Sequence, residues 1–204
     1  MKLYDTAVAP NPRRVRWVMS EKAITDIEVV RLNMAEGQHK TDDLLSQTEG
    51  FVGLPILELD DGTTLTESLA ICRYLESKYP DPNLFGTTPE EAAVIEMWTR
   101  RTELLVAHPL MIGVRHLSPM LAGLEQQDAV VGGYNRDQAL KALGLLDQRL
   151  KGRDWLAADR LTIADIVAFI GLDFTRLIRM ALPEHLTEVA RWADAMRARP
   201  AAQA

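Results

Sequence analysis

The sequence predicts a small α/β domain followed by an all-helical domain, and three observations support this prediction. From residue 1 to about residue 79, short β-like runs alternate with helix-like segments. The segment 80–87 then contains prolines and a glycine that cannot continue a helix. After it, strand-like patterns almost vanish and apolar residues recur at helical spacing. We therefore expect domains over residues 1–79 and 88–204, joined by a linker over 80–87.

The first domain follows the pattern strand, helix, strand, helix, hairpin, helix. These predicted elements cover residues 2–4, 12–22, 27–32, 39–47, 55–65 and 66–79. The hairpin is the best marked of them, because Asp61-Gly62 lies between two apolar runs. The order predicts one mixed sheet with helices packed against it.

The second domain consists of helices only. The predicted helices cover residues 90–117, 134–152, 162–180 and 185–199. In the second of them, leucines recur every three or four residues and form one apolar stripe. Thr162 and Asp165 resemble a capping box ahead of the third helix, so we expect this pair to stabilise the fold.

Composition and charge disfavour several classes of function. The net charge of −6 argues against nucleic-acid binding, because phosphates require a basic face. The single cysteine, Cys72, allows no intramolecular disulfide and is expected to be a buried small hydrophobe. The first residues do not resemble a secretory signal, and no apolar run approaches the length of a membrane span. We expect a cytoplasmic protein without nucleic-acid or membrane partners.

The segment "VAPNPRRVRW", residues 8–17, places Asn11 between two prolines at the start of the first predicted helix. Asparagine is a preferred N-cap residue and proline suits the next position, so the pattern predicts Asn11 as N-cap and Pro12 as the first helical residue. A helix N-terminus also stabilises a bound anion or thiolate. No cysteine of the chain lies nearby in the sequence, so in that interpretation a ligand supplies the thiol.

Several segments together resemble the cytosolic glutathione S-transferases, and the likeness runs over nearly the whole chain. They are the helix start just described, Leu54-Pro55, and the segments "DDGTTLTESLAICRYLE", "MWTRRTEL" and "DWLAADRLTIADI". The resemblance implies a thioredoxin-like N-terminal domain that binds glutathione and a helical domain that shapes a pocket for a small electrophile. It also implies glutathione as co-substrate, attack by its thiolate in a detoxifying transfer, and a homodimer. The histidines show no metal-ligand spacing, so no metal is expected.

The resemblance assigns two segments to the cysteinyl and glycyl parts of glutathione. Family members hold the proline that matches Pro55 in the cis form, which exposes backbone groups of Leu54 to the cysteinyl part. The alternative is a trans proline that opens an edge strand. His39 and Lys40, with Gln38 as a third candidate, would hold the glycyl carboxylate. A solvated charged turn is the alternative there.

The resemblance assigns Glu67-Ser68 to the γ-glutamyl end of glutathione. Ser68 and its backbone N–H would hold the carboxylate, while Glu67 would face the ammonium group. The alternative is purely structural, with Thr66 or Ser68 acting as a helix cap.

The residue that activates the thiol departs from the common family types. Ala9 stands where serine-type members place a hydroxyl, and Asn11 stands where cysteine-type members place a thiol. Asn11 after a proline is similar to the nu-class arrangement, although Ala9 replaces the threonine of that class. Tyr4, at the end of the first strand, is a second candidate. Two rivals to the transferase reaction remain: a glutathione-dependent disulfide reductase or peroxidase, and a binding module without turnover.

The resemblance also points to an electrophile pocket along the first long helix of the second domain, facing the cleft between domains. The candidate side chains are Trp98, Arg101, His108 and Arg115, with His116 beside them. For each of these residues alone, an exposed helix stripe is the alternative.

Overall fold

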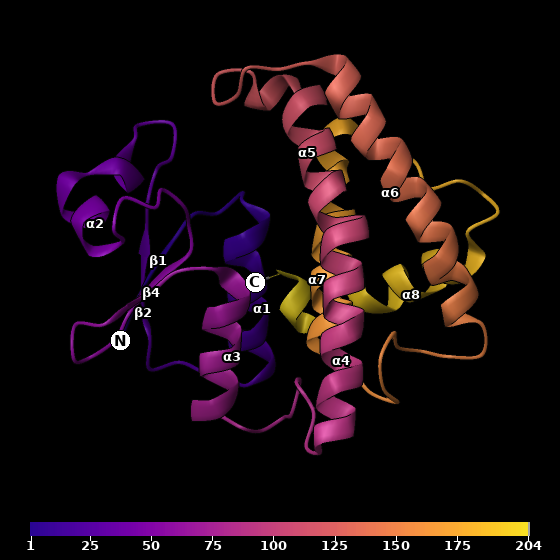
Figure 1. Cartoon of the computed structure of the whole chain (residues 1–204), viewed down its shortest axis with the longest axis horizontal. Helices are drawn as coiled ribbons and strands as arrows, with labels where there is room; N and C mark the ends of the chain where they lie inside the picture. The colour runs from indigo at the N-terminus through magenta and orange to yellow at the C-terminus, as the bar shows by residue number, and fades with distance from the viewer. Residues whose placement is uncertain (204) are drawn as a thin grey trace. The chain divides into compact units, whose positions relative to one another are not determined.

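The computed structural model describes residues 1–203, which form two compact units (Figure 1). Unit 1 contains Met1–Pro82 together with Gln203 near the end of the chain. Unit 2 contains Asn83–Ala202. The division falls within residues 80–87, where the sequence predicts the linker.

Unit 1 is built on the mixed four-stranded sheet that the sequence predicts. Its strands are β1 (Lys2–Asp5), β2 (Glu28–Arg31), β3 (Ile56–Glu58) and β4 (Thr64–Leu65), in the spatial order β2-β1-β3-β4. Strand β1 pairs in parallel with β2 and antiparallel with β3, and β3 pairs antiparallel with β4. The β3–β4 turn contains Gly62 at φ 85°, a conformation that favours glycine.

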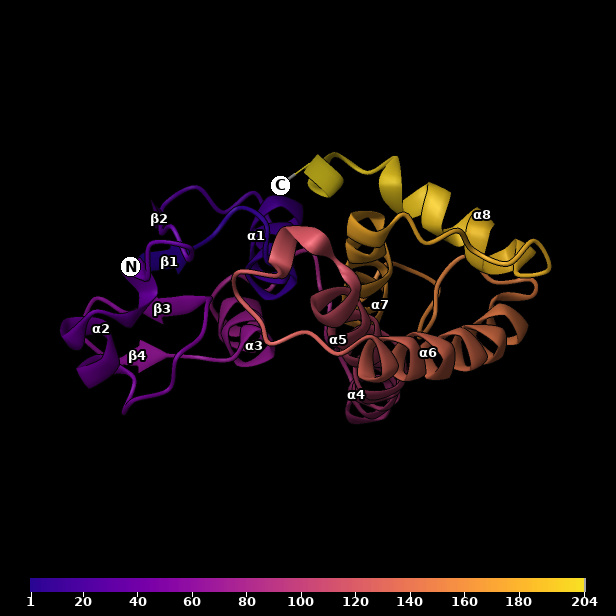
Figure 2. The same ribbon diagram turned by 90° about the horizontal axis from the view of Figure 1, so that it is seen from above.

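Helices cover both faces of this sheet. The helices of unit 1 are α1 (Pro10–Glu21), α2 (Asp42–Gln47), which follows a 3₁₀ turn at Gln38–Lys40, and α3 (Ser68–Lys78). Figures 1 and 2 show α1 and α3 on one face of the sheet and α2 on the other. Fully buried Leu3, Trp17 and Leu75 belong to the core under α1 and α3. A smaller cluster of Leu44, Leu54 and Ile56 lies on the α2 side.

Unit 2 contains only helices and turns. The helices are α4 (Pro89–Thr102), α5 (His108–Leu117), α6 (Ala129–Leu150), α7 (Ile163–Phe174) and α8 (Thr187–Arg197), with 3₁₀ turns at Pro119–Leu121 and Thr175–Ile178. A last 3₁₀ turn, Pro200–Gln203, begins in unit 2, and only its final residue is counted with unit 1. Helix α7 is the centre of the unit, since every residue from Ile163 to Leu172 is buried. Within residues 1–203, no helix is both long and apolar enough to cross a bilayer.

The capping box predicted at the start of α7 is confirmed. The Thr162 hydroxyl and the Asp165 side chain satisfy each other's backbone N–H groups. Asp165 also accepts hydrogen bonds from the Leu156 N–H at 2.9 Å and from Trp192 Nε1 at 3.1 Å. Through Asp165, the start of α7 is therefore hydrogen-bonded both to the segment that precedes it and to helix α8.

The long helix predicted over residues 90–117 is interrupted by a π-helical turn at Glu103–Ala107. Pro109 follows this turn and has no backbone N–H, so it cannot join the regular ladder of i to i−4 hydrogen bonds. The neighbouring His108 N–H donates to the Glu103 carbonyl, five residues back. The turn also meets α7 closely, because a Cβ at Gly171 would lie 2.5 Å from Ala107 Cα.

Candidate functional site

Four connecting segments of unit 1 meet at one edge of the sheet. Parallel β1 and β2 both end at this edge, antiparallel β3 begins there, and β4 ends there. Residues 6–11, 32–41, 52–55 and 66–68 therefore converge. These segments contain every residue that the sequence assigns to glutathione, together with Asn11. The topology thus gathers side chains that lie far apart along the chain.

The predicted N-cap role of Asn11 is wrong. Helix α1 begins at Pro10, and Ala9 is its N-cap residue, with extended backbone and no side-chain hydrogen bond to the helix. The first turn of a helix leaves its N–H groups without intrahelical partners, so Pro10 and Pro12 lose no hydrogen bond there. Asn11 is therefore the second helical residue, and its backbone N–H lies in the first turn.

The side chain of Asn11 has an unsatisfied polar atom. Its Oδ1 atom is buried and has no hydrogen-bond partner among residues 1–203. A buried carbonyl oxygen without a partner is costly, so such an atom usually faces a ligand or water. The amide offers a donor as well as an acceptor, and it lies at the positive end of α1. It fits a group that exchanges a proton, such as a thiol.

Tyr4 makes a different connection. Its hydroxyl donates a hydrogen bond to Glu58 Oε2 at 2.8 Å, on the neighbouring strand β3. Burial, followed by this hydrogen bond and the charge of Glu58, raises the pKa of Tyr4 to about 12. A phenol already donating to a carboxylate has no second proton to offer to a thiolate.

The Leu54-Pro55 peptide bond is cis, as the family resemblance implies. Both residues are buried and lead directly into β3, where Ile56 lies opposite Tyr4. The bond therefore sits beside the carboxyl end of β1. A second cis bond, Asp81-Pro82, was not predicted, because nothing in its local sequence distinguishes it from a trans bond.

Helix α3 begins without a capping side chain. Glu67 is its N-cap residue, exposed and with a left-handed φ of 66°, and neither Thr66 nor Ser68 caps the helix. Ser68 is buried, and its hydroxyl oxygen accepts a hydrogen bond from Arg14 Nη1 at 3.3 Å. First-turn N–H groups, a hydroxyl and a buried guanidinium therefore lie together, which suits a carboxylate. Arg14 was not predicted as a site residue, although an arginine on a helix that is largely buried points to a role of this kind.

His39 and Lys40 differ in exposure. His39 is buried in the 3₁₀ turn, its Nδ1 has no hydrogen-bond partner among residues 1–203, and burial lowers its pKa. Lys40 is exposed. Lysine therefore provides the positive charge of this turn at neutral pH, while His39 remains neutral. The described residues contain no group of three His, Cys, Asp or Glu side chains placed to hold a metal ion.

The structure brings together only two of the four residues predicted to form the electrophile pocket. These two are Trp98 and Arg101: the guanidinium carbon of Arg101 lies 4.9 Å from the centre of the Trp98 ring. Arg149 on α6 lies over the same ring, at 4.8 Å. Arg115 instead pairs with Glu125 in the segment after α5. His108 is exposed at the start of α5.

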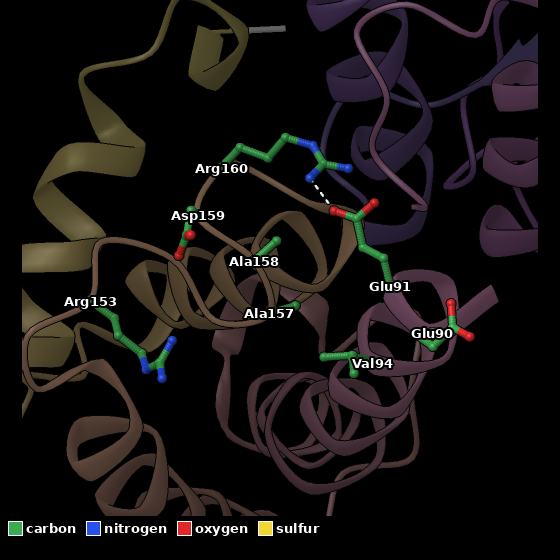
Figure 3. A pocket seen from close by; sticks show the side chains of 8 residues that line it. All are labelled: Glu90, Glu91, Val94, Arg153, Ala157, Ala158, Asp159 and Arg160. Atoms are coloured by element: carbon green, nitrogen blue, oxygen red, sulfur yellow. Dashed lines mark hydrogen bonds and ion pairs between the residues drawn. The ribbon is translucent and has the colours of Figure 1, made fainter. Parts of the chain in front are cut away.

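A groove of unit 2 lies elsewhere. It has a volume of about 500 Å³ and runs between the start of α4 and residues 153–160 (Figure 3). Arg160 pairs with Glu91 at one end, while Arg153 extends toward the groove from the other side. None of the four predicted residues lines this groove, so we do not assign the electrophile to it.

Comparisons with known proteins identify the family of both units. The chain matches the family descriptions "Glutathione S-transferase, N-terminal domain" over residues 3–83 and "Glutathione S-transferase, C-terminal domain" over residues 107–200. It is 34% identical to glutathione S-transferase 2 of Saccharomyces cerevisiae, covering 98% of this chain and 87% of the relative. It is 32% identical to glutathione S-transferase 3 of Zea mays, covering 100% and 91%.

A solved structure shows the same fold. The crystal structure of a glutathione S-transferase domain-containing protein from Marinobacter aquaeolei superposes with a TM-score of 0.90 at 34% identity, covering 98% of this chain and 99% of the other. Sequence and fold therefore agree over both units. The chain belongs to the glutathione S-transferase family.

Proposed function

We propose that the protein is an enzyme that binds glutathione at the sheet edge of unit 1 and transfers its thiolate to a small electrophile. The observation that carries the proposal is the buried, unpartnered Oδ1 of the Asn11 carboxamide in the first turn of α1, at the edge where the assigned segments meet. Partial positive charge and N–H donors at a helix start lower the pKa of a thiol placed there. The Asn11 amide adds a hydrogen bond to the sulfur.

We assign the glutathione contacts as follows. Backbone groups of Leu54 pair with the cysteinyl part, next to the cis bond before Pro55. Ser68 and the first-turn N–H groups of α3 hold the γ-glutamyl carboxylate, and exposed Glu67 faces the ammonium group. In this assignment the ligand's carboxylate faces hydrogen-bond donors and its ammonium group faces a carboxylate.

The glycyl carboxylate is assigned to Lys40, whose charge is available at neutral pH. His39 is buried and neutral, so it contributes a hydrogen bond and not a charge. Tyr4 is not assigned to the sulfur, because its hydroxyl already donates to Glu58.

The electrophile contacts are assigned to exposed side chains of α4 and α5, namely Arg101 and His108. Trp98 supports Arg101 by its ring contact, while Arg115 is engaged by Glu125. We also propose a homodimer, as the family resemblance implies, with the same surface of each chain in contact.

Replacement of Asn11 tests the proposal. Aspartate at the second position of α1 suits the helix start, so Asn11→Asp is expected to fold. An ionised aspartate cannot donate a hydrogen bond and repels a thiolate, so the pKa of bound glutathione should rise by about one unit and turnover should largely disappear. Asn11→Ser keeps a donor on a shorter side chain and should be intermediate.

The measurement is an ultraviolet titration of the thiolate of bound glutathione, with parallel assays using an aryl halide, a hydroperoxide and a disulfide. The assay with the highest rate identifies the reaction class. If Asn11→Asp binds glutathione and turns over like the parent, Asn11 has no role at the sulfur. The backbone N–H groups at the start of α1 would then activate the thiol.

A further inference from the structure

Arg16 is a buried guanidinium that the proposed reaction does not use. It is only 8% exposed, although it lies on helix α1 with no ligand assigned to it. Its Nη1 donates to the fully buried carboxylate of Asp5, Oδ1, at 2.5 Å. Burying two charges is costly unless each is well hydrogen-bonded, so the arrangement calls for an explanation.

The same guanidinium also holds the loop that connects β1 to α1. Nη1 donates to the Thr6 carbonyl and Nη2 to the Ala7 carbonyl, both at 3.2 Å. Among residues 1–203, residues 6–8 form no hydrogen bond with another backbone group. The side chain of Arg16 therefore holds this loop with hydrogen bonds that the backbone does not provide. Its planar fork can reach two carbonyls and a carboxylate together, which a lysine ammonium cannot do with the same geometry.

The loop leads directly to the start of α1. Ala9 follows it as the N-cap residue, and Asn11 lies in the first helical turn. A movement of the loop therefore changes where the first turn and the Asn11 amide point. In catalysis, a misplacement of about 1 Å can cost about 100-fold in rate.

Arg31 provides a natural comparison, because it binds the same carboxylate without touching the loop. It pairs with Asp5 Oδ2 from the end of β2, and its side chain is 52% exposed. No hydrogen bond joins it to the Thr6 or Ala7 carbonyl. A change of Arg31 therefore alters only the charge beside Asp5, whereas a change of Arg16 also alters the hydrogen bonds that hold the loop.

We propose that Arg16 is a positioning residue, which fixes the β1–α1 loop through the Thr6 and Ala7 carbonyls and so holds the Asn11 amide at the reacting sulfur. The proposal rests on the proposed function of Asn11. It adds that the precision of the thiol site comes from a residue further along α1, which does not touch the substrate.

The test compares Arg16→Lys with Arg31→Gln in the full chain, with glutathione and an aryl halide as substrates. Arg16→Lys keeps the charge beside Asp5 and loses the bridge to both carbonyls. We expect the pKa of the bound thiol to rise by about one unit and kcat near pH 6.5 to fall by about tenfold. The KM for glutathione should change by less than about twofold, because its carboxylates bind elsewhere. Arg31→Gln should leave the thiol pKa and kcat at parent values.

Different results separate the two proposals. If the parent leaves the pKa of bound glutathione at its free value, the proposed function fails and the role of Arg16 fails with it. If the parent lowers this pKa and Arg16→Lys lowers it equally, only the role of Arg16 is overturned. An equal effect of Arg31→Gln also overturns it, because charge on Asp5 and not the loop would then be responsible.

Should Arg16→Lys fail to fold, the paired change of Asp5→Asn with Arg16→Gln removes both buried charges and keeps one neutral hydrogen bond. The bridge to the two loop carbonyls is lost in this variant as well. The same rise in thiol pKa and fall in kcat are expected, and parent values would overturn the proposal.

Discussion

Replacing Gly171 by alanine tests the close contact between α7 and the π-helical turn. The added Cβ would lie 2.5 Å from Ala107 Cα and 2.6 Å from Ala107 Cβ. Carbon atoms in normal contact are about 3.5–4.0 Å apart, so the two elements would have to separate by about 1 Å. Neither atom can rotate away, since one is backbone and the other is attached directly to it.

Two opposing terms set the magnitude for Gly171→Ala. Alanine favours a helix by about 1 kcal/mol relative to glycine. Overpacking of a tight core costs about 1–3 kcal/mol, and the rigid contact with Ala107 places this site at the upper end. The net loss is therefore about 1–2 kcal/mol. For a chain of this size, each kcal/mol shifts Tm by about 2–4 °C.

Gly144→Ala in α6 is the matched control. A Cβ at Gly144 meets nothing within 4 Å, so only the helix-propensity term remains and Tm should rise by about 2–4 °C. The assay is thermal unfolding of the parent and both variants at one protein concentration. If Gly171→Ala raises Tm as Gly144→Ala does, the close approach of α7 to the π-helical turn is wrong.

Two further predictions concern helix starts in unit 2. Glu91 pairs with Arg160 and accepts hydrogen bonds from the Thr87 N–H and hydroxyl, which together lower its pKa from 4.5 to about 2. A lowered pKa stabilises the fold above pH 4.5 and loses this effect as the pH falls toward 2, so Glu91→Gln should lower Tm at pH 7 and the difference should shrink below pH 4.5. A difference that stays constant down to pH 3 would contradict this. Asp147 on α6 accepts two backbone N–H groups from the first turn of α8, at 2.8 and 3.0 Å. Asp147→Ala should cost about 1–2 kcal/mol in thermal unfolding, while Asp154→Ala, at an exposed surface pair, should cost little. Equal effects of the two changes would show that Asp147 is not a cap.

The segments that we assign to glutathione can be recognised in the sequence because each is short and has its own pattern. Leu54-Pro55, the Asp61-Gly62 turn and Ser68 follow one another at fixed spacing, and the family resemblance supplies their roles. The capping box of Thr162 and Asp165 is equally local. The start of α1 was misplaced, because two prolines and an asparagine are all acceptable in a first turn.

The sequence by itself determined the strands, most of the helices and the family, because apolar periodicity and turn residues act over short distances. Only the tertiary structure decided which groups meet. It paired Arg14 with Ser68, 54 residues away, and placed Asp147 at the start of α8, which has no capping side chain of its own. It also joined Arg16 to Asp5 and to the loop before Asn11. These contacts depend on how elements pack across the sheet and the helical core, and residue patterns along one segment do not contain that information.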